Sequence, residues 1–249
     1  MKNCVNCVSC NNPISENYCS NCGQAAKLKR IDKHYMSHEA MHLLHYEKGF
    51  VYSAKELLLR PGVRIKEFID QNRNKLMKPV AYLILTSLLY TLVANFFHVS
   101  DFYNDKAKIS LGKSSVTAIM NWVNTNYGYA NLLSGIFIAG CVKLFFRKTA
   151  YNFFEIIILL CFVMGQAMLL MTLTTFFVGF LGKQLYMTIL FVTSFGYMVW
   201  AIGQFFDGTK IMSYVKAFFA YLLGTVLFYL AIIPIGLTVD FIVKLFATH

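Results

Sequence analysis

Residues 79–97 read PVAYLILTSLLYTLVANFF, an apolar stretch that begins with a proline. A helix needs about 20 mostly apolar residues to cross the hydrocarbon core of a bilayer. Proline is tolerated in the first turn of a helix, because the N–H that it lacks would have no partner there. The stretch therefore predicts a membrane-spanning helix, and it marks the point at which a polar, basic chain becomes apolar.

Four further apolar stretches follow the first one, and we predict spans at 130–146, 153–177, 185–206 and 215–239. For the last, an alternative is a span that ends near Pro234 and is followed by a short interfacial helix. The chain is 57% hydrophobic and 14% charged, whereas soluble domains carry about 25% charged residues. The expected fold class is therefore all-α: a multi-pass transmembrane helical bundle of about five spans over residues 79–249, with a long polar loop at 98–129.

Basic residues are concentrated directly before the first span. Residues 27–78 carry twice as many Lys and Arg as Asp and Glu. Cations beside a span favour the cytoplasmic side and contact anionic lipid headgroups, and their position here argues against a nucleic acid as the partner. The first 25 residues contain no apolar run typical of a cleavable signal peptide. We therefore expect a cytoplasmic N-terminus, an external C-terminus, and contact of residues 27–78 with the bilayer.

The end of this basic region is amphipathic. Residues 53–79 read SAKELLLRPGVRIKEFIDQNRNKLMKP, in which apolar and basic residues recur at helical spacing on both sides of a Pro-Gly pair. The pattern predicts two short helices that are broken at Pro61 and Gly62. A basic amphipathic helix beside a span tends to lie in the membrane interface.

A cysteine cluster begins the chain, where residues 4–22 read CVNCVSCNNPISENYCSNC. Two Cys-x-x-Cys pairs that are separated by a short loop are typical of a tetrahedral zinc site. The other common use of such cysteines, a disulfide framework, needs an oxidising compartment, but the charge pattern predicts the cytoplasm. Residues 1–26 are therefore predicted to form a zinc ribbon.

Three cysteines overlap at the start of the cluster, so the first pair is either Cys4 with Cys7 or Cys7 with Cys10. The residue after the second cysteine of such a turn often needs a left-handed backbone. Asn11, which follows Cys10, tolerates that conformation, whereas the β-branched Val8, which follows Cys7, resists it. Cys4 is therefore treated as a spare cysteine. The predicted metal ligands are Cys7, Cys10, Cys19 and Cys22.

The predicted zinc ion has a structural role. Gly23 follows the last cysteine and adopts a left-handed conformation without strain. Four thiolates close the coordination shell, which leaves no position for water or substrate. A segment of this length builds no core of its own, so bound Zn²⁺ would supply its folding energy.

The predicted spans offer little catalytic chemistry. Their interior holds no carboxylate, and Gln166 and Gln204 are the only long amides well inside them. We therefore expect a non-enzymatic scaffold, sensor or docking protein whose zinc ribbon binds a cytoplasmic protein partner. The alternative is a small-solute transporter or channel that uses these two amides, although an amide inside a span more often bonds a neighbouring helix.

A histidine stripe within the basic region gives a second alternative, a membrane metalloenzyme. Four histidines recur at spacings that place them on one face of a helix, and neutral imidazoles one turn apart can share a metal ion. No second histidine cluster accompanies them, so an interfacial helix with histidines on its polar side is the simpler interpretation. The stripe consists of His34, His38, His42 and His45.

The first 95 residues resemble a known family, the bacterial membrane proteins grouped as domain of unknown function 3667. The matching features are a ribbon that ends in Cys-Gly-Gln, a Lys-Gly-Phe segment, a Pro-Gly turn, and a basic stretch that leads into a proline-initiated span. Here they are residues 22–24, 48–50, 61–62 and 73–79. The chain departs from the family at 71–73, where Gln-Asn-Arg replaces Gly-Lys-Arg. The resemblance implies a location in the bacterial inner membrane and brings no assigned activity.

Overall fold

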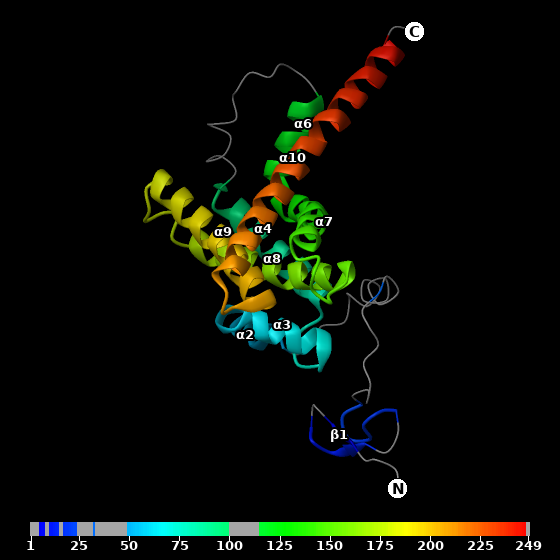
Figure 1. The fold of residues 1–249 in the computed structure, drawn as a ribbon. Coiled ribbons are helices and arrows are strands. Elements are labelled where there is room, and N and C mark those ends of the chain that lie inside the picture. Colours follow the sequence, from blue (N-terminus) through cyan, green and yellow to red (C-terminus); the bar gives the residue numbers. More distant parts are fainter. Residues whose placement is uncertain are drawn as a thin grey trace.

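The computed structural model describes residues 5–7, 10–14, 17–23, 32, 49–99 and 115–247, and nearly all of this part of the chain beyond residue 49 is helical (Figure 1). The elements, in chain order, are β1 (Val5–Asn6), β2 (Pro13–Ile14), α2 (Phe50–Leu59), α3 (Pro61–Asp70), α4 (Pro79–Phe96), α6 (Ser115–Thr125), α7 (Tyr127–Phe145), α8 (Phe153–Thr175), α9 (Lys183–Asp207) and α10 (Ile211–Ala247). The predicted all-α helical bundle is confirmed.

The apolar helix α8 forms the centre of this bundle, and most of its residues are buried. Helices α4, α7 and α9 pack against α8, while α10 packs against α7 and α9. Successive long helices run in alternating directions, so that α2 and α3 lie at one end of the bundle and the C-terminus of α10 lies at the other (Figure 1). We call these the hairpin end and the distal end.

Four of the described helices are long and apolar enough to cross a membrane: α4, α8, α9 and residues Ile211–Ile242 of α10. They correspond to the first, third, fourth and fifth predicted spans. The second predicted span coincides with α7, whose apolar part, Tyr129–Phe145, is shorter, so its crossing of the membrane stays a prediction.

α10 continues through Pro234 and is 37 residues long, so no separate helix begins after that proline. Whether the span itself ends near Pro234 stays a prediction. At a rise of 1.5 Å per residue, α10 is about 55 Å long, well beyond the roughly 30 Å of a hydrocarbon core. Its distal part packs against α6, a helix inside the segment predicted as a loop. The backbone N–H of Ser115 donates to the Asp240 carboxylate at 2.8 Å, which fixes the start of α6 on α10.

The buried acid of α8 begins that helix. The backbone N–H of Glu155 donates to Asn152 Oδ1 at 2.9 Å, and the backbone N–H of Asn152 donates to Glu155 Oε2 at 2.6 Å. This reciprocal capping box satisfies two amides that have no partner within the helix. Glu155 is only 5% exposed, and the cap explains why a carboxylate is buried there.

Small residues let α7 and α10 approach closely. A Cβ atom added to Gly224 would lie 2.6 Å from the Cα of Ile138, so this contact needs a glycine. One turn earlier on α10, Ala220 is fully buried. Close backbone approach of this kind stabilises helix pairs in a bilayer, where apolar burial between helices gains little.

Helices α2 and α3 form a hairpin, residues 50–70, that is broken at Pro61 as the sequence predicts. In an α-helix the carbonyl of Leu57 would accept the N–H of the residue four positions later. That residue is Pro61, which has no N–H, so this carbonyl needs another donor. The phenol of Tyr197 in α9 donates to this carbonyl at 2.9 Å. Helix α9 therefore supplies the hydrogen-bond donor that the C-terminus of α2 lacks.

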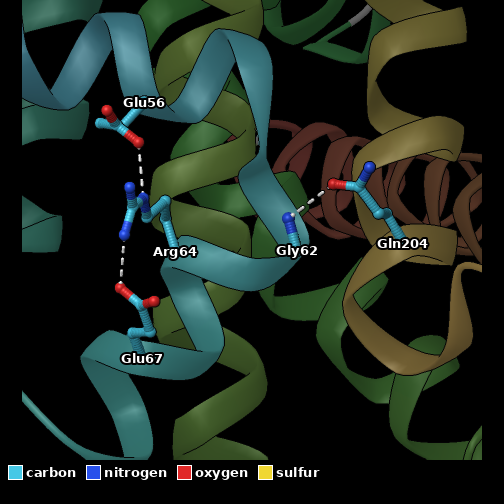
Figure 2. Close-up of polar contacts among 5 residues, drawn as sticks. All are labelled: Glu56, Gly62, Arg64, Glu67 and Gln204. Carbon is cyan, nitrogen blue, oxygen red and sulfur yellow. Dashed lines mark hydrogen bonds and ion pairs between the residues drawn. The ribbon is translucent and has the colours of Figure 1, made fainter.

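Helix α9 also supplies a hydrogen-bond acceptor to the start of α3 (Figure 2). The backbone N–H of Gly62, in the first turn of α3, donates to Gln204 Oε1 at 3.0 Å. Arg64 joins the two hairpin helices, because its guanidinium contacts Glu56 of α2 and also donates to Glu67 of α3 at 2.8 Å. The hairpin is thus packed against the ends of the spans by specific polar contacts as well as by its apolar face.

Candidate metal centre

The predicted ribbon is built on two very short strands. β1 and β2 pair antiparallel, with Val5 opposite Ile14 and Asn6 opposite Pro13. Cys7 follows β1 directly, and its backbone N–H donates to the carbonyl of Asn12 at 2.8 Å. This pairing folds the chain back on itself and brings the first cysteine pair toward the second.

Both cysteine pairs end in a left-handed residue, at the two positions where the sequence predicts one. Asn11 has φ 59° and Gly23 has φ 73°. In the first turn, the N–H of Asn11 donates to the carbonyl of Cys7 at 2.8 Å, and in the second, the N–H of Gly23 donates to the carbonyl of Cys19 at 2.9 Å. The two turns therefore share one geometry and direct their cysteine side chains to a common point.

The structure brings the four predicted ligands together. Their Sγ atoms all lie within 4.8 Å of one another. The Sγ atoms of Cys7 and Cys22 are 3.5 Å apart, as are those of Cys10 and Cys19. None of the four cysteines forms a disulfide.

These separations fit a tetrahedral zinc ion. A Zn–S bond of about 2.3 Å places two thiolates of a tetrahedron about 3.8 Å apart, and the observed range brackets this value. Four sulfur donors select zinc or iron over magnesium or calcium, which prefer oxygen ligands. The donor set can therefore hold one metal ion, and zinc stays the predicted identity.

The environment of the cluster favours metal binding. A hydrogen bond from the backbone amide of Asn12, supported by the thiols of Cys22 and Cys19, lowers the pKa of Cys10 to about 6. The thiolate, which is the form that binds metal, is therefore favoured near neutral pH. Cys7 and Cys19 are each 2% exposed and pack with Ile14, so the thiols themselves form most of the small core.

Several candidates from the sequence lie outside the described residues. These are Cys4 and the histidine stripe, which consists of His34, His38, His42 and His45. Within the described part of the chain, the four-thiol cluster is the only group of three or more His, Cys, Asp or Glu side chains that is arranged to hold a metal ion.

The two amides that are candidates for a transport path each have a hydrogen-bond partner on another helix. Gln166 is buried in α8, and its Oε1 accepts a hydrogen bond from the phenol of Tyr82 in α4. Gln204 accepts the amide of Gly62. Each amide thus joins one helix to another, which is the usual role of a polar side chain inside a span.

Tyr197 and Tyr82 are the residues of this interior network that the sequence does not reveal. Their phenols, far from Leu57 and Gln166 along the chain, meet these partners only after the helices pack. A signal for Tyr197 is nevertheless present, because Pro61 leaves the carbonyl four residues earlier in need of a donor.

The apolar helices and their packing define the class of the protein: it is an α-helical membrane protein. Residues 47–91 match the model of a family that is described as a protein of unknown function, DUF3667. The match covers the hairpin and most of α4, and it confirms the resemblance that the sequence shows. No curated protein and no solved structure matches the chain.

Proposed function

We propose that the protein is a non-enzymatic membrane scaffold or sensor whose N-terminal zinc ribbon is a docking module in the cytoplasm. The observation that carries this proposal is the cluster of four thiols within 4.8 Å of one another. A metal ion held by all four has no open position, so it stabilises a fold and offers no site for a reacting molecule.

The orientation rests on the charges at the hairpin end. Tyr151, between α7 and α8, is 3.5 Å from the Asp70 carboxylate at the end of α3, so the basic α7–α8 connection lies beside the hairpin. The cations at this end include Lys55, Arg60, Arg73, Lys75, Lys78, Arg147, Lys148, Lys210 and Lys216. Such an excess favours the cytoplasmic face of a bacterial inner membrane, on which the ribbon then lies.

Cobalt substitution tests the structural role of the metal. Chain purified with Co²⁺ in place of Zn²⁺ is expected to show the visible absorption of a tetrahedral thiolate site. Azide or imidazole should leave this spectrum unchanged, because a closed shell has no position for an added ligand. A spectrum that shifts on addition of azide would identify an open, catalytic type of site and contradict the proposal.

Site-specific photo-crosslinking in cells tests the docking role. Tyr18 lies on the ribbon and is 67% exposed, so a photoreactive residue in its place is expected to capture a cytoplasmic protein in one defined product. The Cys19→Ser change should abolish that product, because the ribbon loses its metal. A matched position at the distal end, Phe180, is 90% exposed and should not give it. If the Tyr18 product is absent, or persists in Cys19→Ser, the docking role is wrong.

A further inference from the structure

The outer surface of the hairpin combines exposed aliphatic side chains with cations. On α2, Val51, Lys55 and Leu58 follow one another at helical spacing, so they share one face. Val51 is 78% exposed, and Leu58 is 44% exposed. Together with the exposed residues at the turn they form the outer hairpin face, which consists of Val51, Lys55, Leu58, Leu59, Arg60 and Val63.

The inner face of the hairpin fixes the direction of this surface. Leu57 and Ile65 are fully buried, and Phe68 packs edge-on against Phe162 of α8, with ring centroids 5.1 Å apart. The polar contacts of the hairpin with α9 hold both of its helices in place. The outer hairpin face therefore cannot turn inward, and its aliphatic side chains are covered by something outside the described chain or remain in water.

Both ionised side chains among the six residues of the outer hairpin face, Lys55 and Arg60, are positive. Glu56, which follows Lys55 on α2, contacts Arg64 of α3. Aliphatic side chains with interspersed cations and no acid are typical of a surface that lies in the headgroup region of a membrane. There the aliphatic groups reach the acyl chains, and the cations extend to the phosphates.

We infer that the outer hairpin face binds anionic phospholipid in the leaflet at the hairpin end. The position of the hairpin supports a lipid rather than a soluble partner. The first turn of α3 contacts the last turn of α9, and α3 leads through a basic connector into α4. The hairpin thus lies where two spans end, at headgroup depth. The cations Arg73, Lys75 and Lys78 of the connector extend the same positive surface. This inference is independent of the zinc site.

A tryptophan reporter tests whether lipid covers this face. The chain has two tryptophans, Trp122 and Trp200, and replacing both by phenylalanine leaves L58W as the only indole. In vesicles of phosphatidylcholine with phosphatidylglycerol, brominated acyl chains are expected to quench the L58W fluorescence strongly, whereas acrylamide in water should quench it weakly. Quenching by acrylamide alone, or by neither agent, would place the face against water or protein and overturn the inference.

The anionic preference is tested with the full chain and spin-labelled lipids. The native protein should bind spin-labelled phosphatidylglycerol in preference to phosphatidylcholine. K55Q/R60Q is expected to remove most of this preference, because it removes both cations of the outer hairpin face, which attract anionic lipid headgroups. The matched control K183Q removes a cation from the distal end and should retain the preference. An unchanged preference in K55Q/R60Q would equally overturn the inference.

Discussion

Replacing Cys19 with serine is expected to remove zinc from the ribbon and leave the spans inserted. The purified native chain should contain about one zinc ion, as a single four-thiolate site requires, and Cys19→Ser should contain almost none. The loss is large because structural zinc contributes roughly 10–16 kcal/mol to small zinc-dependent folds, and the buried Cys19 lies 3.5 Å from Cys10 at the centre of the cluster. Elemental analysis of the purified protein measures the metal content, and membrane extraction confirms insertion.

The matched control for this experiment is Cys4→Ser. Cys4 belongs to the same sequence cluster but lies outside the described residues. The four described thiols already complete a tetrahedral shell, so this variant should keep its zinc. Cys22→Ser should behave as Cys19→Ser does. Full zinc occupancy in Cys22→Ser, or loss of zinc in Cys4→Ser, would show that the ligand assignment is wrong.

The second large effect is expected from Gly62→Ala. A Cβ atom at this position would lie 2.5 Å from the backbone carbon of Gln204 and 2.6 Å from its oxygen. Neither helix can relieve this contact by turning a side chain, and forced overpacking costs about 1–3 kcal/mol. The thermal unfolding midpoint in detergent should therefore fall by several degrees, at about 2–4 °C for each kcal/mol in a chain of this size.

The sign of the Gly62→Ala effect separates packing from helix propensity. Alanine is the better helix former by about 1 kcal/mol, so propensity alone would raise the midpoint. Gly196 in α9 supplies the control, because an added Cβ there meets no atom within 4 Å. Gly196→Ala should keep or raise the midpoint, and a Gly62→Ala protein that is equally stable would rule out the close hairpin contact.

The sequence predicts those features of the fold that depend on local pattern. Uninterrupted apolar stretches locate α4, α8 and α9 to within a few residues, and the Pro-Gly pair locates the break between α2 and α3. At the candidate metal centre, the need for left-handed residues singles out Asn11 and Gly23, and both have positive φ. In each case the decisive interaction lies within a few residues along the chain.

Features that depend on distant partners are not predictable in this way. The polar segment before α7 contains α6, which packs on the distal part of α10 and is fixed by Asp240. Pro234 does not end α10, because neighbouring structure in a bundle can compensate for one missing hydrogen bond. The hairpin has the composition of an interfacial helix pair, yet its inner face is buried against α8 and α9. Only the packing of all these helices decides between such outcomes.

The two contacts that α9 makes with the hairpin also imply an order of events during synthesis and membrane insertion of the protein. A ribosome releases the hairpin well before it has made Tyr197 and Gln204, which respectively complete the end of α2 and the start of α3. Until α9 enters the membrane, the carbonyl of Leu57 and the amide of Gly62 can bond only water or a temporary partner. The segment that carries the family signature therefore reaches its final form late in biogenesis, although it is among the first parts to be translated.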